Sequence, residues 1–269
     1  MRDKYFKDLL LRLFHSLGID IAHRTDYKEL KSLISLLTPF NSGFDLIRLG
    51  PDGDGGYLIP NDLEGIDYAF SPGVSNESGF ELDLANLGMG VFLADYSVSD
   101  TKQKHSNFDF TKKFISSLSN EIYITLDEWI KEKVSDYNDD LLLQMDIEGE
   151  EFEVITSTAL DTLSRFRIIV IEFHYLQELL NRQFYNIASK AFKKLLQTHS
   201  VVHIHPNNHC GSIKFKDLEI PRVAEFTFLR NDRFKNKVPE IQFPHKLDKD
   251  NLKKRKTLVL HKCWYDFKK

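Results

Sequence analysis

The stretch LLLQMDIEGEEFE, which spans residues 141–153, decides the fold. Its first five residues are almost continuously apolar, and such a run is typical of a strand buried on both faces of a sheet. Asp146 and Glu148 follow, and the chain then turns at Gly149. The stretch therefore predicts a buried strand that delivers Asp146 to a turn, and then a helix. In the first turn of that helix, three acidic residues are expected to offset the positive end of the helix dipole, namely Glu150, Glu151 and Glu153.

Six similar apolar segments surround this stretch, and helical patterns separate them. The seven predicted strands are residues 68–70, 91–94, 122–124, 141–145, 168–171, 201–205 and 224–229. Helices are predicted between them, around residues 80–87, 125–130 and 188–196. Continuously apolar strands that alternate with helices indicate a parallel sheet covered on both faces. We predict one doubly wound α/β domain whose sheet is mostly parallel.

The composition is that of a globular protein with an apolar core. Of the 269 residues, 42% are apolar and 28% are charged, and the net charge is −4. This charge leaves no broad basic field that would hold nucleic acid. Cys210 and Cys263 are the only cysteines, and their spacing indicates neither a disulfide framework nor a structural zinc site. No stretch reaches the roughly 18 apolar residues needed to span a bilayer, so we expect a cytoplasmic protein.

Residues 4–39 carry two helical patterns, and the second stops before Pro39. We predict that residues 1–42 form an N-terminal helical extension that caps the main domain over residues 43–269. Two alternatives are a homodimer contact and docking on a membrane surface. The first pattern supports any of the three, because charged residues are set between apolar residues at helical spacing, namely Leu9, Leu10, Leu13, Phe14 and Leu17.

Several predicted strands end in polar residues, and most of these are ionisable. They are Ser71–Ser75, Asp95, Asp146, Glu172 and His203–His205. In open α/β sheets, ligands bind beyond the carboxyl ends of the strands, near the point where the strand order reverses. We therefore expect these residues to share one binding site.

The first strand, its turn and its helix have the layout of a nucleotide-binding unit. Gly73 would let the backbone approach a ligand, and Asp95 stands 22 residues later, where a carboxylate can bind the hydroxyls of an adenosine ribose. The turn lacks a complete GxGxxG pattern because Ser75 replaces the middle glycine. A dinucleotide pyrophosphate needs the close backbone approach that glycines allow. The sequence therefore favours S-adenosylmethionine over NAD.

Six motifs follow one another along the chain: Ser71-Pro72-Gly73-Val74-Ser75, Phe80-Glu81, Asp95, Asp146-Ile147-Glu148-Gly149-Glu150, Ile171-Glu172-Phe173-His174 and His203-Ile204-His205-Pro206-Asn207-Asn208. In this order they resemble the FkbM-like family of S-adenosylmethionine-dependent methyltransferases, over roughly residues 45–232. The resemblance implies a class I methyltransferase (Rossmann-like) fold with a seven-stranded sheet. It also implies S-adenosylmethionine as the donor and O-methylation of sugars or natural products.

Carried over residue by residue, the resemblance and the strand ends divide the site into two sides. The donor would be surrounded by Ser71, Gly73, Ser75, Glu77, Glu81, Asp95, Tyr96, Asp146 and Glu148. The acceptor would face Glu172, His174, His203, His205 and Asn207. Removing a proton from an alcohol assists its attack, and we assign this role to His205 first and His174 second. A divalent ion, Mg²⁺ or Mn²⁺, is an alternative, held by Asp146, Glu172 and His205.

The predicted function is O-methylation of a small polar acceptor. The family suggests a sugar or nucleotide-linked sugar for a surface or capsule polysaccharide, although no motif here identifies the acceptor. Two other classes stay open at this point. A metal-dependent hydrolase would use the same rim of Asp, Glu and His without a nucleotide, and a non-catalytic α/β module would bind a saccharide or a partner protein. An NAD-dependent oxidoreductase is disfavoured by the incomplete glycine turn.

Overall fold

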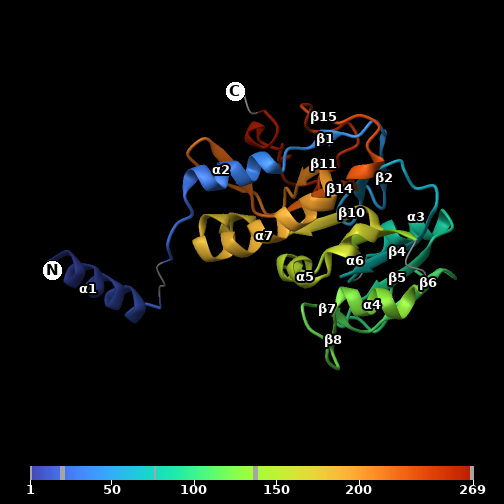
Figure 1. Ribbon diagram of the computed structural model, residues 1–269, viewed down its shortest axis with the longest axis horizontal. Helices are drawn as coiled ribbons and strands as arrows, with labels where there is room; N and C mark the ends of the chain where they lie inside the picture. The colour runs from blue at the N-terminus through green and yellow to red at the C-terminus, as the bar shows by residue number, and fades with distance from the viewer. Residues whose placement is uncertain (1, 19–21, 76, 136–138, 267–269) are drawn as a thin grey trace.

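A seven-stranded sheet forms the centre of the protein, with strand order β11-β14-β10-β9-β4-β5-β6 (Figure 1). The structure is a computed structural model and describes residues 2–18, 22–75, 77–135 and 139–266. The strands of the sheet are β4 (Ile66–Pro72), β5 (Gly90–Ala94), β6 (Phe108–Thr111), β9 (Asp140–Met145), β10 (Phe166–Phe173), β11 (His199–Pro206) and β14 (Ala224–Arg230).

The strand pairings make the sheet doubly wound. From β4 the chain adds β5 and β6 in parallel on one side, and then returns to add β9 and β10 in parallel on the other. Strand β14 runs antiparallel to both β10 and β11. The order of the strands therefore reverses between β4 and β9, and the mostly parallel, doubly wound sheet that we predicted is confirmed.

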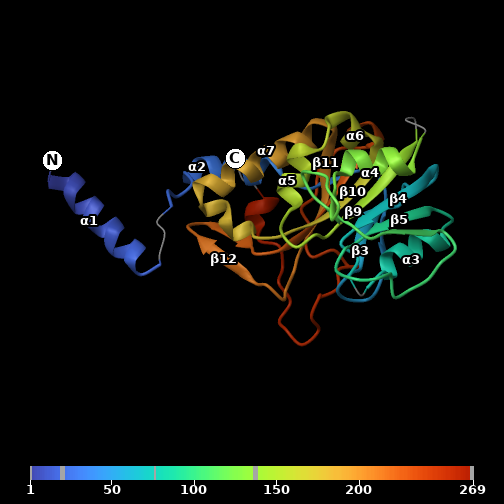
Figure 2. The ribbon, with the colours of Figure 1, turned by 90° about the horizontal axis from the view of Figure 1, so that it is seen from below.

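Helices cover both faces of the sheet, as Figure 2 shows. One face packs against α2 (Tyr27–Leu36), α4 (Leu126–Lys133), α5 (Glu151–Ser157), α6 (Leu160–Arg165) and α7 (Arg182–Thr198). The other face packs against α3 (Gly79–Asn86) and the hairpin of β2 (Leu46–Leu49) and β3 (Tyr57–Pro60). Alternate residues of the buried strands serve the two layers: Leu141 and Leu143 belong to the first core, and Leu142 belongs to the second.

Short elements complete the fold. Besides the β2–β3 hairpin, small two-stranded sheets pair β1 (Phe40–Asn41) with β15 (Val238–Pro239), β7 (Phe114–Ile115) with β8 (Tyr123–Ile124), and β12 (Ser212–Phe215) with β13 (Leu218–Pro221). The 3₁₀ helices among the described residues are η1 (Leu176–Leu180), η2 (Asn231–Arg233) and η3 (Lys262–Trp264).

One predicted strand of the main sheet is wrong. Residues 122–124 were expected to be the third strand, but Tyr123–Ile124 pairs only with Phe114–Ile115, outside the main sheet. The position beside β5 is taken by β6, Phe108–Thr111. This strand lies at the edge of the sheet, and its residues are partly or fully exposed. Because β6 is only partly buried, it lacks the continuous apolar run that is typical of a strand buried on both faces.

The two N-terminal helices differ in their packing. In α2, Leu30, Leu33 and Ile34 belong to the main core. Helix α1 (Arg2–Ser16) lies away from the sheet in both views (Figures 1 and 2), and its Leu9 and Leu13 are exposed. The predicted boundary between residues 42 and 43 stays a prediction. In the described part of the chain, no helix has the length and apolar content needed to cross a bilayer.

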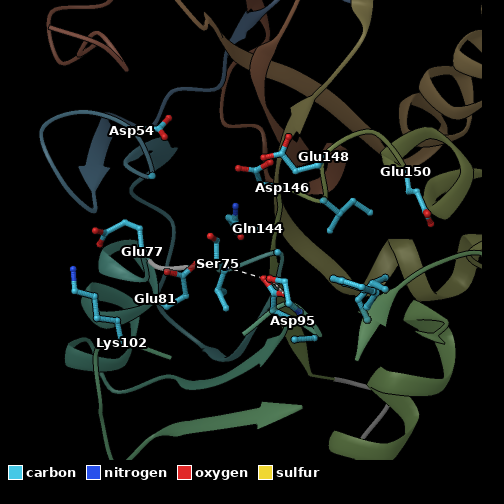
Figure 3. Close-up of a pocket in the computed structure, with 18 of the residues that line it drawn as sticks. Asp54, Ser75, Glu77, Glu81, Asp95, Lys102, Gln144, Asp146, Glu148 and Glu150 are labelled. Carbon is cyan, nitrogen blue, oxygen red and sulfur yellow. Dashed lines mark hydrogen bonds between the residues drawn. The ribbon is translucent and has the colours of Figure 1, made fainter. Parts of the chain in front are cut away.

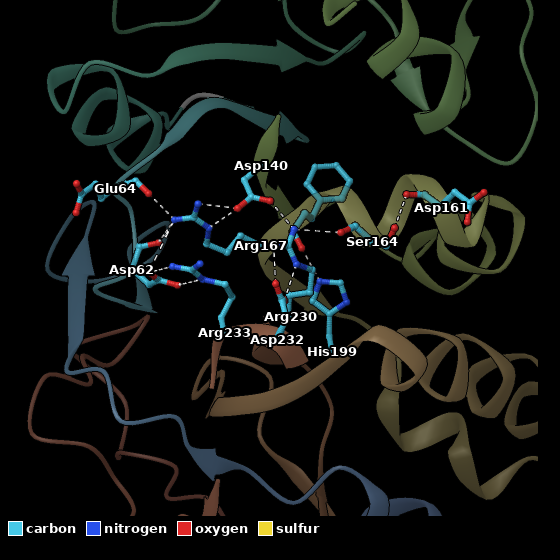
Figure 4. Close-up of polar contacts among 11 residues, drawn as sticks. Asp62, Glu64, Asp140, Asp161, Ser164, Arg167, His199, Arg230, Asp232 and Arg233 are labelled. Carbon is cyan, nitrogen blue, oxygen red and sulfur yellow. Dashed lines mark hydrogen bonds and ion pairs between the residues drawn. The ribbon is translucent and has the colours of Figure 1, made fainter. Parts of the chain in front are cut away.

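A buried network of charges ties the amino ends of β9 and β10 together (Figure 4). The Arg167 guanidinium donates to Asp140 Oδ2 at 2.8 and 2.6 Å and to the Asp62 carbonyl at 3.1 Å. Arg230 donates to the other oxygen of Asp140 at 2.5 Å, and Arg233 holds both carboxylate oxygens of Asp62 at 2.8 Å. Burial alone would raise the pKa of Asp140, but the two arginines outweigh it and lower this pKa. The network lies at the amino ends of the parallel strands, on the side of the sheet opposite their carboxyl ends. Its expected role is therefore to stabilise the fold.

Replacing Arg167 by Ala is expected to lower the free energy of unfolding by about 3 kcal/mol, because Asp140 and the Asp62 carbonyl would lose a buried partner. Chemical denaturation measures the change. The matched control is Arg182→Ala, whose ion pair with Glu29 has side chains 40% and 44% exposed. That solvent-exposed pair should contribute far less to stability. Equal losses for the two variants would contradict a structural role for the buried network.

Candidate functional site

A cavity of about 780 Å³ opens at the carboxyl ends of β4, β5 and β9, where the strand order reverses (Figure 3). Seven of its lining residues predicted from the sequence are Gly73, Ser75, Glu77, Glu81, Asp95, Asp146 and Glu148. The others are Asp54, Gly55, Tyr57, Val74, Ala94, Ser97, Lys102, Phe114, Ile115, Tyr123, Gln144, Ile147 and Glu150. The predicted donor residues Ser71 and Tyr96 are not among the lining residues.

The turn after β4 lies directly against the end of β9. Gly73 has a φ of +88°, and a Cβ placed there would lie 1.6 Å from the Asp146 carbonyl oxygen. The backbone N–H of Asp146 donates to the Pro72 carbonyl at 3.2 Å, and that of Gly73 donates to Ala94 at 2.9 Å. Only glycine allows this approach. The turn therefore brings the ends of β4, β5 and β9 to one place.

Asp95 fixes the wall of the cavity between β4 and β5. Its Oδ2 accepts from the Ser75 N–H at 2.9 Å, and its Oδ1 accepts from the N–H and the hydroxyl of Ser97 at 2.7 and 2.6 Å. Ser75 is held at a φ of +42°, which is unusual for a residue other than glycine. A carboxylate accepts about four hydrogen bonds. Asp95 therefore keeps roughly one acceptor position for a ligand hydroxyl.

A buried polar chain supports the floor of the cavity. Ser71 Oγ lies 2.5 Å from Glu81 Oε1 and 2.7 Å from Gln144 Oε1, and the Gln144 amide donates to the Tyr57 hydroxyl at 3.1 Å. A serine hydroxyl has one proton, so these two short contacts are both satisfied when Glu81 carries a proton. Burial raises the pKa of Glu81 to about 7. Ser71 thus acts beneath the cavity surface, by orienting Glu81 and Gln144.

Asp146 and His174 meet at the edge of the cavity. Burial raises the pKa of Asp146 to about 7, although the neighbouring His174 opposes this shift. Among the described residues, Asp146 Oδ1 has no hydrogen-bond partner. His174 Nε2 lies 3.9 Å from this oxygen and 3.4 Å from Glu148 Oε2. The imidazole therefore turns one nitrogen toward the acidic residues of the cavity.

Glu151 holds the other nitrogen of His174, and the sequence analysis missed this role. Its Oε1 lies 3.0 Å from His174 Nδ1 and accepts from the Gly149 N–H at 2.9 Å. Glu151 is fully buried, whereas we had grouped it with the acidic residues that offset the dipole of α5. The signal was its spacing: Val154, Ile155 and Thr158 are buried at the third, fourth and seventh positions after it. This periodicity places Glu151 on the inward face of the helix.

None of the five predicted acceptor residues is among the residues that line the cavity, although His174 lies beside two of these, Asp146 and Glu148. Glu172 and His205 are both paired with Glu225 of β14, which lies between them in the sheet. Asn207 donates to Glu172 Oε1 at 2.8 Å. Burial would lower the pKa of His205, but Glu225 and then Asp248 outweigh it and raise this pKa to about 9. His205 is not among the residues that line the cavity, and its assignment as the base stays a prediction.

The predicted metal ligands are not brought together. In the part of the chain that the structure describes, two groups place three ligand atoms within 4.8 Å of one another. One is Asp146, Glu148 and His174, and the other is His203, His205 and Asp248. Asp146, Glu172 and His205 do not form such a group, because Glu225 stands between the last two in the sheet.

The C-terminal tail reaches the cavity through Asn251. Its amide Nδ2 donates to Asp54 Oδ1 and to Glu225 Oε1, both at 3.0 Å. Asp54 lies in the glycine-rich loop between β2 and β3 and lines the cavity. Nothing in the tail sequence had indicated this contact, because Asn251 is about 200 residues from Asp54 in the chain.

The charge of the cavity selects among ligands. Of the described lining residues, seven carry carboxyl groups and one, Lys102, carries a cation. Such a lining disfavours phosphate groups and favours a cation. Phe114, Ile115 and Tyr123 add an apolar wall. A ligand with a flat ring, a diol and a positive charge therefore fits these residues, and S-adenosylmethionine has all three features.

The comparison with protein families identifies a methyltransferase domain. The model of the methyltransferase FkbM domain matches residues 63–211. No curated protein matches the chain.

Two solved structures give low structural scores. One is a methyltransferase ascribed to an antibiotic biosynthesis pathway of Anabaena variabilis, with 11% identity, coverage of 68% of this chain and 67% of that chain, and a TM-score of 0.28. The other is a mutant 16S rRNA (adenine(1408)-N(1))-methyltransferase from Catenulisporales acidiphilia, with 11% identity, coverage of 72% and 100%, and a TM-score of 0.31. Scores of this size carry no argument about the fold or the site.

Replacing Gly73 by Ala is expected to distort the cavity, because the new Cβ would clash with the backbone of Asp146. The matched control is Gly88→Ala, since Gly88 has a φ of +99° and nothing within 4 Å of its Cβ position. The control should lose about 1 kcal/mol of stability from backbone strain alone. Gly73→Ala should lose about 2 kcal/mol more. Thermal or chemical unfolding compares the two, and similar losses would show that the turn does not need to approach β9.

Proposed function

Because the chain belongs to the FkbM methyltransferase family, as the match over residues 63–211 shows, we propose that it methylates a hydroxyl of a sugar acceptor with S-adenosylmethionine as the donor. The sheet order and the antiparallel β14 are those of a class I methyltransferase. One observation carries the proposal: a single cavity at the reversal of strand order contains both Asp95 and Asp146. A nucleoside held at one residue would have its reactive end near the other.

The donor side of the cavity can hold each part of S-adenosylmethionine. Asp95 accepts a hydrogen bond from a ribose hydroxyl, and Phe114, Ile115 and Tyr123 offer an apolar wall for the adenine ring. Glu81 and Asp146 stabilise positive charge once they are ionised. When bound, S-adenosylmethionine supplies an electrophilic methyl group on a sulfonium cation. S-adenosylmethionine fits because most polar side chains that line the cavity are carboxylates, which accept hydrogen bonds and attract a cation.

His174 is the base that the geometry favours. The contact of 3.0 Å with Glu151 fixes the ring, and the opposite nitrogen faces the edge of the cavity. Burial alone would lower the pKa of His174, but its hydrogen bond and charge interaction with Glu151, and the charges of Asp146 and Glu148, raise it. A positioned base of this kind contributes about 10²–10⁴-fold to a rate. His174 therefore takes the proton of the acceptor hydroxyl in this proposal.

The acceptor presents an uncharged hydroxyl to the cavity. Asp54, Glu148 and Glu150 lie on the lining and would repel a phosphate group there. In a nucleotide-linked sugar, the diphosphate would have to lie outside this lining. We propose a sugar, free or linked to a nucleotide in this way. Its use in a surface polysaccharide comes from the family resemblance alone, and the cytoplasmic location stays a prediction from the sequence composition.

Calorimetry with S-adenosylhomocysteine tests the donor site. Wild-type protein should bind one equivalent, and Asp95→Ala should bind about 10- to 100-fold more weakly, because a hydrogen bond to a charged group contributes about 1.5–3 kcal/mol. Asp109→Ala is the matched control. Asp109 lies on β6, forms an ion pair with Lys133 of α4 and does not line the cavity. A hydrolase or a saccharide-binding module would give no heat with S-adenosylhomocysteine, and an unchanged affinity of Asp95→Ala would remove Asp95 from the donor site.

A pH–rate profile tests His174. The acceptor is first identified by methyl transfer from labelled S-adenosylmethionine to a panel of free and nucleotide-linked sugars. His174→Gln should then lower kcat by about 10²–10⁴-fold and leave the affinity for S-adenosylhomocysteine unchanged. The wild-type rate should rise with pH through a pKa above 6.5, because the raised pKa keeps His174 protonated at lower pH.

The Glu151→Gln variant weakens the interaction that raises the pKa of His174. The rising limb of its pH–rate profile should therefore move to lower pH. The exposed His23→Gln variant serves as the control and should keep the wild-type profile. If the limb stays in place in both Glu151→Gln and His174→Gln, another group is the base.

A further inference from the structure

A second cluster of ligand-type side chains lies away from the donor cavity, on the far strand of the sheet. His203 Nε2 is 2.8 Å from Asp248 Oδ1, and His205 Nδ1 is 3.6 Å from the same oxygen. The ligand atoms of all three residues lie within 4.8 Å of one another. The side chains are 3%, 7% and 7% exposed, so the cluster is shielded from solvent.

The fold brings these residues together for identifiable reasons. His203 and His205 are two residues apart on β11, and alternate residues of a strand point to the same face. Asp248 comes from the tail after β15, where a turn fixes it: its Oδ2 accepts from the His245 N–H at 2.8 Å, and its own N–H donates to the His245 carbonyl at 2.9 Å. The two imidazoles and the carboxylate are therefore held from two distant parts of the chain.

We propose that His203, His205 and Asp248 form a zinc site. Two imidazole nitrogens and one carboxylate are a common ligand set for Zn²⁺, which binds nitrogen and oxygen ligands at about 2.0–2.2 Å. In a tetrahedral site with such bonds, neighbouring ligand atoms are roughly 3.3 Å apart. The two contacts of 2.8 and 3.6 Å lie on either side of this value. The ligand nitrogens of His203 and His205 lie within 4.8 Å of each other and would have to move closer on binding.

A hollow beside the cluster can supply the fourth ligand. It has a volume of about 110 Å³ and is lined by His205, Asp248 and His245, among others. The His245 ring lies 6.1 Å from the His203 ring, measured between centroids. Water from this hollow, or His245 itself after a rotation, completes the coordination. The cysteine spacing had indicated no structural zinc, because these ligands are histidines and an aspartate that meet only in the folded chain.

The site would anchor the tail next to the donor cavity. Asn251 follows Asp248 by three residues and makes the two hydrogen bonds to Asp54 and Glu225. Fixing Asp248 on β11 limits the movement of Asn251 and of the glycine-rich loop that carries Asp54. The role is structural, and it does not depend on the proposed methyl transfer.

The experiment is metal titration of the full chain after chelator treatment. We expect one equivalent of Zn²⁺ by calorimetry and one equivalent of Co²⁺ with the intense visible absorption of a tetrahedral site. Zn²⁺ should also raise the thermal midpoint of unfolding, since binding to the folded state stabilises it. His203→Ala and the nearly isosteric Asp248→Asn should both abolish stoichiometric binding.

Two controls keep the outcome decisive. His174→Ala breaks the other three-residue group, Asp146, Glu148 and His174, and should keep one tetrahedral Co²⁺ site. Binding of S-adenosylhomocysteine, or an unchanged near-ultraviolet circular dichroism spectrum, shows that Asp248→Asn is folded. The proposal is overturned if the wild type binds no equivalent of either metal, or if folded Asp248→Asn and His203→Ala bind as the wild type does. Loss of the site in His174→Ala alone would also overturn it.

Discussion

The close contact between the turn after β4 and the end of β9 is the constraint on which the site depends. At Gly73 the two backbones approach so closely that a Cβ would lie 1.6 Å from the Asp146 carbonyl oxygen. This contact places Asp146 beside the turn, and the hydrogen bond from the Ser75 N–H places Asp95 on its other side. The two carboxylates thereby share one cavity. The position of His174 depends on the turn after β9, because Glu151 accepts from the Gly149 N–H of that turn and contacts the imidazole.

Most of the sheet could be predicted from the sequence because six of its strands are buried on both faces. Ile168–Ile171 is apolar throughout and Leu141–Met145 is apolar except for Gln144, and the structure places both segments in the centre of the sheet. The edge strand Phe108–Thr111 escaped notice because its burial is partial. The segment at residues 122–124 is apolar for another reason: Ile124 packs in the main core from a separate small sheet. The pattern of apolar residues predicts whether a segment is buried, but it does not predict which strand that segment pairs with.

The donor side of the candidate site could be predicted from the sequence, whereas the acceptor side could not. Residues on the donor side follow the ends of β4, β5 and β9, so their shared position could be inferred from the topology alone. The acceptor side could not, because His203 and His205 are covered by the tail through Asp248, which lies more than 40 residues along the chain. Glu225 and Asn251 belong to the same long-range contacts. Glu151 was hidden among acidic neighbours, and only the burial of its face of α5 separates it from Glu150 and Glu153.

The central claim is that adenosine binds at Asp95 with the reactive end of the donor directed toward Asp146. A crystal structure of the complex with S-adenosylhomocysteine measures this directly. We expect a ribose hydroxyl within hydrogen-bond distance of the Asp95 carboxylate, and a sulfur atom between the Gly73 turn and Asp146, on the side that His174 faces. Product bound in the hollow beside His205 and Asp248, or in the cavity without a contact to Asp95, would contradict it.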